Sequence, residues 1–312
     1  MKGPLFYSKI LLFGEYGIIK DSKGLSIPYN FYNGALKSSD NFTESQEKSN
    51  KNLERFVSYL EQLQNENPEM VTFDITALRQ DIANGLYFDS SIPQGYGVGS
   101  SGALVAAIYD QYAKNKITIL ENLTREKLLK LKAIFGEMES FFHGKSSGLD
   151  PLNSYLSLPI LINSKDNIET TGIPSQTEKG KQAVFLIDSG IIGETAPMVN
   201  IFMDKMKKEG FRKMLKDKFV KHTDACVEDF LKGDAKSLFG NMKKLSKVVL
   251  HNFKPMIPKQ FHQIWKEGIE SGAYYLKLCG SGGGGYILGF TQDIDKAKKI
   301  LKDYPLEVVY NF

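Results

Sequence analysis

Short apolar runs alternate along this chain with longer stretches in which apolar residues recur at helical spacing. Loosely alternating apolar residues over 5–13 predict a strand that runs into a turn at 14–17, and a second strand over 24–32 would complete a hairpin. The segment 38–52 is polar and rich in turn residues. Further apolar runs of strand length predict strands at 71–75, 86–92, 159–163, 183–188, 274–278, 286–290 and 306–309.

Helices are predicted where apolar residues recur every three or four positions. The clearest case starts after the N-cap candidate Thr124 and ends near Phe142. Strands interleaved with helices in both halves of the chain indicate an α/β or α+β architecture. The other helices are expected at 52–67, 103–112, through most of 189–271, and at 294–301.

The polar stretch 164–181 is the best candidate for a domain boundary. A domain usually has roughly 100–200 residues, so a chain of 312 residues holds one large domain or two ordinary ones. We therefore expect an N-terminal domain over 1–181 and a C-terminal domain over 182–312.

Composition narrows the class of protein. Hydrophobic residues make up 42% and charged residues 24% of the chain, which is typical of a water-soluble globular protein and excludes a mainly disordered or collagen-like chain. The two cysteines and four histidines form no spaced cluster, so neither a disulfide framework nor a zinc site is indicated. No apolar run approaches the roughly 20 residues of a membrane-spanning helix, and no targeting segment is recognised. We expect a cytoplasmic protein that does not bind membranes.

The charge balance gives no sign of a nucleic-acid partner. Lys and Arg number 40 against 36 Asp and Glu, a net charge of +4. The lysines are spread over the chain without a basic stripe or interleaved aromatic residues, so solvated lysines are the favoured interpretation.

The segment 93–102 is the first of three glycine-bearing segments. Its part 97–102 fits the GxGxxG spacing of a dinucleotide-binding loop, and Glu121 lies near the position of the acidic residue expected in such a fold. Two adjacent serines equally fit a phosphate-binding loop, because helix N-terminal N–H groups attract anions and a hydroxyl can reach a metal. Phosphate binding, dinucleotide binding and a purely structural turn are all open for this loop alone.

The second segment follows the helix that ends near Phe142. Glu139 precedes its end by one turn, and Asp150 comes eleven positions later, beyond a Gly/Ser loop. A helical carboxylate can hold Mg²⁺, and an Asp on a loop can accept the proton of an attacking hydroxyl. Each residue also has a structural interpretation: Glu139 on a solvated face, His143 as a cap or core residue, Asp150 at the end of a turn.

The third segment, 280–285, has five glycines and one serine between two predicted strands. Six small residues cannot fill a core. They form either a flexible hairpin tip or a backbone that approaches a ligand closely.

Together these segments resemble the GHMP kinase superfamily, which is named for galactokinase, homoserine, mevalonate and phosphomevalonate kinases. Residues 92–103 (IPQGYGVGSSGA) resemble its PxxxGLGSSAA motif, and 277–285 (KLCGSGGGG) resemble its KxTGAGGGG motif. Two further segments are similar to mevalonate kinase members of the superfamily. These are 9–15 (KILLFGE), which resembles KVILFGE, and 143–150 (HGKSSGLD), which resembles HGxPSGxD.

The resemblance implies an α+β, two-domain GHMP kinase fold, with a ribosomal-protein-S5-like N-terminal α/β domain and a ferredoxin-like C-terminal domain. It implies that Asp150 is the catalytic base and that Lys9 assists ionisation of the substrate hydroxyl. Ser101 and Glu139 would hold Mg²⁺. The residues implied to bind ATP are Pro93, Gly95, Gly97, Gly99, Ser100, Ser101, Gly102, Gly282 and Gly283. The residues implied on the substrate side are Glu15, His143, Ser147 and Thr195.

The implied activity is transfer of the ATP γ-phosphate to the primary hydroxyl of mevalonate, a step of isoprenoid precursor synthesis. The quoted motifs contain no Arg, which favours an unphosphorylated acceptor because forked Arg donors suit substrate phosphates. The alternatives are another GHMP kinase acting on phosphomevalonate, homoserine or a sugar, or a non-catalytic ligand sensor. Besides the small-molecule substrate we expect no partner, and we expect a monomer or a homodimer.

Two positions depart from the family pattern: Tyr16 stands where His is usual, and Ser146 where Pro is usual.

Overall fold

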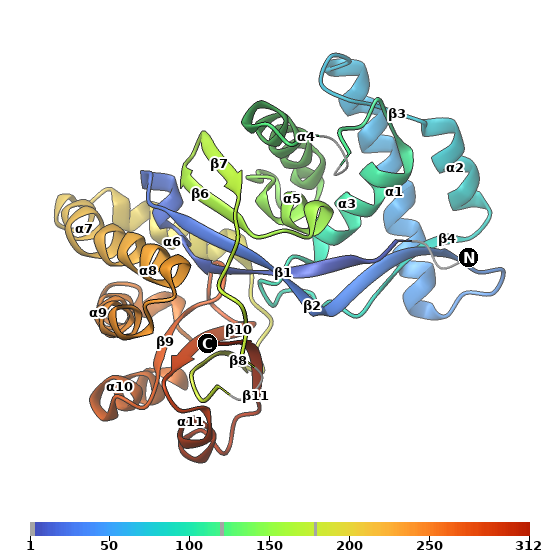
Figure 1. Ribbon diagram of the computed structural model, residues 1–312. Coiled ribbons are helices and arrows are strands. Elements are labelled where there is room, and N and C mark those ends of the chain that lie inside the picture. The colour runs from blue at the N-terminus through green and yellow to red at the C-terminus, as the bar shows by residue number, and fades with distance from the viewer. Residues whose placement is uncertain (1–3, 119–121, 178–179) are drawn as a thin grey trace. The chain divides into compact units, whose positions relative to one another are not determined.

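The computed structural model describes residues 4–118, 122–177 and 180–312 (Figure 1). Glu121, considered above for a dinucleotide-binding fold, lies outside the described residues.

The chain divides into two compact units, and neither is continuous in sequence. Two long strands explain this, because β1 (Phe6–Phe13) and β2 (Gly24–Ser38) each pass from one unit into the other. The division into domains at 181/182 stays a prediction, since the compact units follow a different division. The first unit contains the chain up to Lys9, Pro28–Pro93 and Gly99–Leu158; the second contains Ile10–Ile27, Gln94–Val98 and Pro159–Phe312.

The first unit is mainly helical. The end of β2 pairs antiparallel with β4 (Leu86–Ser90), and a short ladder joins β3 (Thr72–Phe73) to β5 (Ala113–Lys114). The predicted helices at 103–112 and 124–142 are confirmed, and the Thr124 hydroxyl accepts a hydrogen bond from the N–H of Lys127 at 3.3 Å. The helices of this unit are α1 (Glu44–Glu66), α2 (Ile75–Ala83), α3 (Ser100–Tyr112), α4 (Arg125–His143) and α5 (Leu149–Leu156).

Local capping groups explain where this unit departs from the predicted pattern. The helix expected to start near residue 52 begins at Glu44, inside the polar segment 38–52, because Thr43 and Gln46 form a reciprocal capping box there. The strand expected at 71–75 shrinks to β3, because the Asp74 side chain accepts a hydrogen bond from Ala77 N–H and starts α2.

The second unit contains an antiparallel sheet in the order β11-β8-β10-β9. Its connectivity is β-α-β-β-α-β, the pattern of ferredoxin-like folds, so the expectation for the C-terminal half is confirmed. All four strands agree with predicted ones. They are β8 (Ala183–Asp188), β9 (Tyr275–Leu278), β10 (Tyr286–Thr291) and β11 (Leu306–Asn311).

Two further strands complete this unit, β6 (Ile160–Ser164) paired with the start of β2, and β7 (Asn167–Thr170) paired with β6. β7 lies inside the polar stretch 164–181, where no strand was expected. The helices are α6 (Thr195–Met206), α7 (Glu209–Met214), α8 (Lys221–Lys232), α9 (Ala235–Asn252), α10 (Phe261–Ser271) and α11 (Ile294–Ile300), with a π-helical segment at Leu215–Val220 and 3₁₀ turns at Gly17–Lys20 and Lys254–Met256.

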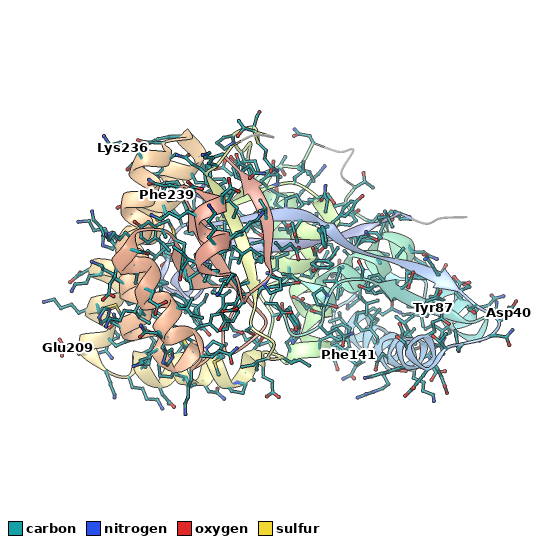
Figure 2. The ribbon with its side chains drawn as sticks, turned by 90° about the horizontal axis from the view of Figure 1, so that it is seen from below. Asp40, Tyr87, Phe141, Glu209, Lys236 and Phe239 are labelled. Atoms are coloured by element: carbon teal, nitrogen blue, oxygen red, sulfur yellow. The ribbon has the colours of Figure 1, made fainter. Side chains whose placement is uncertain are left out.

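The helices present apolar faces to the core and polar faces to solvent. On α9, Lys236 is exposed while Phe239, three residues on, is buried (Figure 2). Trp265 of α10 is fully buried, and its indole N–H donates to the Ser246 hydroxyl of α9 at 2.8 Å. None of the helices described is long and apolar enough to cross a bilayer.

Candidate active site

The starts of two helices meet in the first unit, α3 with its Ser-Ser-Gly sequence and α5 with Asp150 in its first turn. A Cβ added to Gly102 would lie 2.7 Å from the carbonyl carbon of Asp150 and 3.0 Å from its Cβ, so glycine is required for this approach. The expectation that Asp150 lies on a loop is corrected: α5 begins at Leu149. Pro151 is suited to a first helical turn, because the N–H it lacks has no partner there.

Asp150 forms an ion pair with Lys9 of β1. The distance from Lys9 Nζ to Asp150 Oδ1 is 2.8 Å, and the side chain of Lys9 is 5% exposed while that of Asp150 is 37% exposed. The stem of Lys9 is enclosed by Gly99, where an added Cβ would lie 3.1 Å from Lys9 Cγ. The ammonium is therefore held in place while the carboxylate keeps an open side from which a small molecule can reach it.

Glu139 of α4 forms a second cluster with two hydroxyl groups. Ser101 Oγ donates to Glu139 Oε1 at 2.8 Å, and Ser146 Oγ donates to Glu139 Oε2 at 2.5 Å. The Nε2 atom of His143 lies 3.0 Å from the same Ser101 oxygen. The Ser101 hydroxyl thus has two hydrogen-bonding partners, and the imidazole tautomer decides whether His143 Nε2 accepts from it or donates to it.

Burial dominates the electrostatics of Glu139, which is only 3% exposed. Desolvation, followed by the negative charge of Asp150, raises the pKa of Glu139 to about 7. The hydrogen bonds from Ser146 and Ser101 and the charge of Lys9 act in the opposite direction. A cation beside this carboxylate would favour its ionised form.

We expect Glu139→Gln to become more stable relative to wild type as the pH rises. The folded pKa of about 7 exceeds the unfolded value near 4.5, so protonated Glu139 contributes stability that is fully present below about pH 4.5 and is lost as the pH rises through about 7. The difference in free energy of unfolding should change by on the order of 3 kcal/mol over this range. Urea denaturation in EDTA between pH 4.5 and 8 measures it, and a difference that is independent of pH would contradict the raised pKa.

In the second unit the glycine tract after β9 packs against backbone of its own unit. A Cβ on Gly285 would lie 2.5 Å from Tyr96 Cα, and one on Gly282 would lie 2.7 Å from Met256 O. The N–H groups of Gly283 and Gly285 donate to Met256 O and Ile191 O, both at 2.6 Å. Contact with the protein's own backbone already requires these glycines. Their presence therefore does not favour either of the two expectations for this tract, a flexible tip or close approach to a ligand.

The loop residues 94–98 and the start of α6 lie close to this tract in the second unit. Gly95 O accepts from Gly193 N–H at 3.0 Å, and a Cβ on Gly97 would lie 2.9 Å from Cys279 O. The exposed hydroxyl of Thr195 lies 3.5 Å from that of Ser281.

Residues after β1 also contact the tract. Tyr16 is buried, stacks on Phe202 with ring centroids 4.6 Å apart, and donates its hydroxyl to Ser281 O at 2.7 Å. Burial raises the pKa of the Tyr16 phenol above its ordinary value, so the phenol remains a hydrogen-bond donor. Glu15, predicted on the substrate side, is buried with its Oε1 2.8 Å from Lys277 Nζ.

Comparison with known proteins identifies the fold. Residues 56–157 match the sequence model of the GHMP kinases N terminal domain, and no curated protein matches the chain. Among solved structures, L. major mevalonate kinase in complex with R-mevalonate is similar with a TM-score of 0.63 and 18% identity, covering 97% of this chain and 93% of that one. Residues 56–157 are a GHMP kinase N-terminal domain, and the chain has the GHMP kinase fold.

Two other solved structures have nearly the same TM-scores at lower sequence identity. Streptococcus pneumoniae phosphomevalonate kinase in complex with phosphomevalonate and AMPPNP has a TM-score of 0.63 and 13% identity, with 98% of each chain covered. Lactococcus lactis galactokinase complexed with galactose has a TM-score of 0.64 and 11% identity, covering 98% of this chain and 92% of that one. Both the predicted superfamily and the predicted fold class are confirmed, and the acceptor substrate is left open.

The residues predicted for GHMP kinase chemistry fall into both units. The first unit brings together Lys9, Asp150, the start of α3, and the Ser101–Glu139 pair with His143. Pro93 and the exposed Ser147 also belong to the first unit. The second unit holds Glu15, Gly95, Gly97, Thr195, Gly282 and Gly283. The roles assigned to all of these residues stay predictions.

The donor set around Glu139 fits Mg²⁺. Glu139 Oε1 and Ser101 Oγ are adjacent hard oxygen atoms, and Mg²⁺ is commonly held by one or two carboxylates with phosphates and waters completing its shell. Over the part of the chain that the structure describes, no group of three or more His, Cys, Asp or Glu could hold a metal. An ion here would therefore take its further ligands from water and from oxygen atoms of a bound nucleotide.

Two residues of this arrangement were not assigned a role from the sequence. Ser146 was noted only as a departure from the family pattern, and Lys277 only as the first residue of a motif. Ser146 lies seven residues after Glu139, in a glycine loop that turns back along the helix, and this spacing could have indicated the contact between the two. No local feature indicates the ion pair of Lys277 with Glu15, because these residues are 262 positions apart in the chain.

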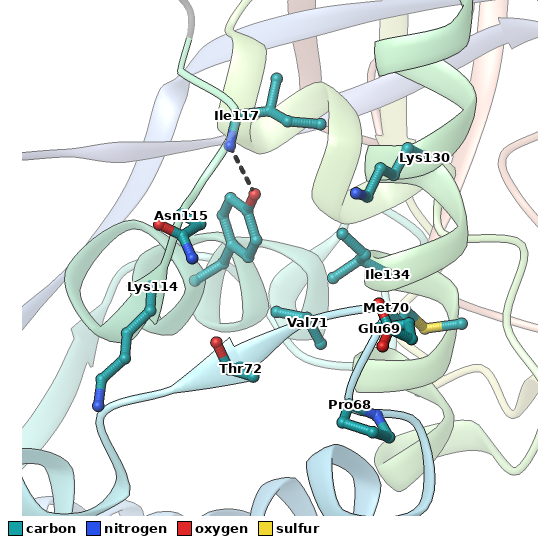
Figure 3. A pocket seen from close by; sticks show the side chains of 11 residues that line it. Pro68, Glu69, Met70, Val71, Thr72, Lys114, Asn115, Ile117, Lys130 and Ile134 are labelled. Carbon is teal, nitrogen blue, oxygen red and sulfur yellow. Dashed lines mark hydrogen bonds between the residues drawn. The ribbon is translucent and has the colours of Figure 1, made fainter.

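The first unit also contains a cavity of about 260 Å³ beside α4 (Figure 3). It shares no lining residue with the candidate site. The backbone N–H of Ile117 donates to the Tyr109 hydroxyl at 3.0 Å across one wall. The other lining residues are Pro68, Glu69, Met70, Val71, Thr72, Lys114, Asn115, Lys130 and Ile134.

Proposed function

We propose that this protein is an ATP-dependent kinase that transfers the γ-phosphate of ATP to the primary hydroxyl of mevalonate. The observation that carries the proposal is the 2.8 Å contact between Lys9 and the half-exposed Asp150, in the same unit as the Ser101–Glu139 pair. The match to the GHMP kinase family supports a phosphotransferase.

Asp150 would act as the general base. Its Oδ atoms accept the proton of the acceptor hydroxyl as the new O–P bond forms and the bond to the β-phosphate oxygen breaks. The ammonium of Lys9 stabilises negative charge on the acceptor oxygen, and its 2.8 Å contact holds the Asp150 carboxylate in place. In-line phosphoryl transfer needs little more from the protein than such positioning and charge stabilisation.

Ser101 and Glu139 would hold Mg²⁺, which when bound neutralises charge on the transferring phosphates. The start of α3 would hold the phosphates themselves. Gly99 precedes this 13-residue helix without a side-chain cap, so its first N–H groups are available to an anion. The GHMP kinase fold favours this assignment over a dinucleotide-binding loop.

Mevalonate is proposed as the acceptor because 9–15 and 143–150 resemble mevalonate kinase motifs and no Arg occurs in the motifs. An assay of ADP release with mevalonate, phosphomevalonate, homoserine and galactose tests the choice. We expect mevalonate to give the highest kcat/KM. Turnover confined to phosphomevalonate would show that mevalonate is not the acceptor. ATP binding without turnover of any acceptor would favour a ligand sensor.

A further inference from the structure

The hydroxyl of Ser146 connects the two parts of the candidate site. It donates to Glu139 Oε2 at 2.5 Å, and the same oxygen accepts the backbone N–H of Gly148 at 3.1 Å. Gly148 is the residue from which α5 starts, and Asp150 lies two positions later. One side chain therefore contacts both the carboxylate predicted to bind metal and the start of the helix that carries the predicted base.

The loop around Ser146 is tightly held. The N–H of Ser146 donates to Ser140 Oγ at 3.3 Å, and Ser140 in turn donates to Gly136 O at 2.7 Å. At Gly148 an added Cβ would lie 2.0 Å from Lys132 O, so the loop lies directly on α4. The Ser146 hydroxyl is consequently placed by contacts that hold residues 146 and 148 against α4.

The hydrogen bonds differ between the two carboxylate oxygens of Glu139. Oε2 accepts from Ser146, which lies in the loop, while Oε1 accepts from Ser101, which lies on α3 outside the loop. Only Oε1 can thus be released without disturbing the loop. Hydrogen bonds to a ligating carboxylate orient it, and their loss typically weakens metal binding about 10- to 100-fold.

We propose that Ser146 is a positioning residue for the metal, an inference that rests on the proposed function. Its hydroxyl fixes Glu139 so that Oε1, beside Ser101, faces the ion, and it ties that orientation to the start of α5. Proline at this position offers no hydroxyl, so the substitution gives this chain a contact that the family pattern does not supply.

The test measures metal-dependent nucleotide binding rather than turnover. Calorimetry gives the Kd of a non-hydrolysable ATP analogue with excess Mg²⁺ and with EDTA. The Kd in EDTA divided by the Kd with Mg²⁺ reports how much the metal strengthens nucleotide binding. We expect Ser146→Ala to reduce this ratio about 10-fold without changing the Kd in EDTA. Ser146→Thr, which retains the hydroxyl, should keep the wild-type ratio.

Ser140→Ala is the matched control, because it removes a hydroxyl that holds the loop through Gly136 O and Ser146 N–H and not through the Glu139 carboxylate. Its ratio should stay within about twofold of wild type, and thermal unfolding confirms that each variant is folded. A ratio unchanged in Ser146→Ala, or reduced equally in Ser140→Ala, overturns the role of Ser146. A wild-type protein whose nucleotide affinity does not respond to Mg²⁺ would instead overturn the proposed function.

Discussion

Asp150→Asn is expected to lower kcat for the acceptor by about 10²- to 10⁴-fold, the range that a positioned general base contributes. Asn has nearly the same shape, and its amide oxygen can still accept a hydrogen bond from Lys9, so the ion-pair partner keeps a contact. What is lost is the ability to accept the proton of the attacking hydroxyl. Steady-state measurement of ADP release with saturating acceptor gives kcat.

The Kd of the ATP analogue with Mg²⁺ is the control for this variant. It should stay within a few-fold of wild type, because Asp150 is assigned to the acceptor hydroxyl and not to the nucleotide. Near-normal turnover of Asp150→Asn with intact nucleotide binding would show that another group takes the proton.

Lys277→Met is expected to destabilise the protein by about 3–5 kcal/mol, the cost of leaving one partner of a buried ion pair without its counter-charge. The side chains of Lys277 and Glu15 are 1% and 5% exposed, and their charged atoms are 2.8 Å apart. Methionine fills a similar volume, so the loss comes mainly from removing the ammonium group that lies 2.8 Å from the buried Glu15 carboxylate. Urea denaturation monitored by circular dichroism gives the change in free energy of unfolding.

The double variant Lys277→Met with Glu15→Gln separates charge from packing. It should recover much of the lost stability, because the buried carboxylate is removed together with its partner. Lys51→Met is the surface comparison: its pair with Glu47 is exposed and should matter little. A double variant as unstable as Lys277→Met alone would attribute the effect to packing.

Local sequence predicted a large part of the fold. The periodic apolar residues before Phe142 and the Thr124 cap correspond to α4, and the apolar runs around the third glycine segment correspond to β9 and β10. Errors arose where a side chain hydrogen-bonds to nearby backbone, as Thr43 and Asp74 do. Such caps start helices in polar sequence that shows little apolar periodicity.

The sequence by itself determined which residues are available for chemistry: a Ser-Ser-Gly helix start, Lys9, Glu139, Asp150, and glycines enriched in three segments. Spacing and motif resemblance are local properties, so they can be read without coordinates. Only the tertiary structure decided that Lys9 pairs with Asp150, that Ser146 holds Glu139, and that Lys277 reaches Glu15. These contacts form because packing brings distant segments together and leaves buried charges and hydroxyls with few other partners, which no local pattern encodes.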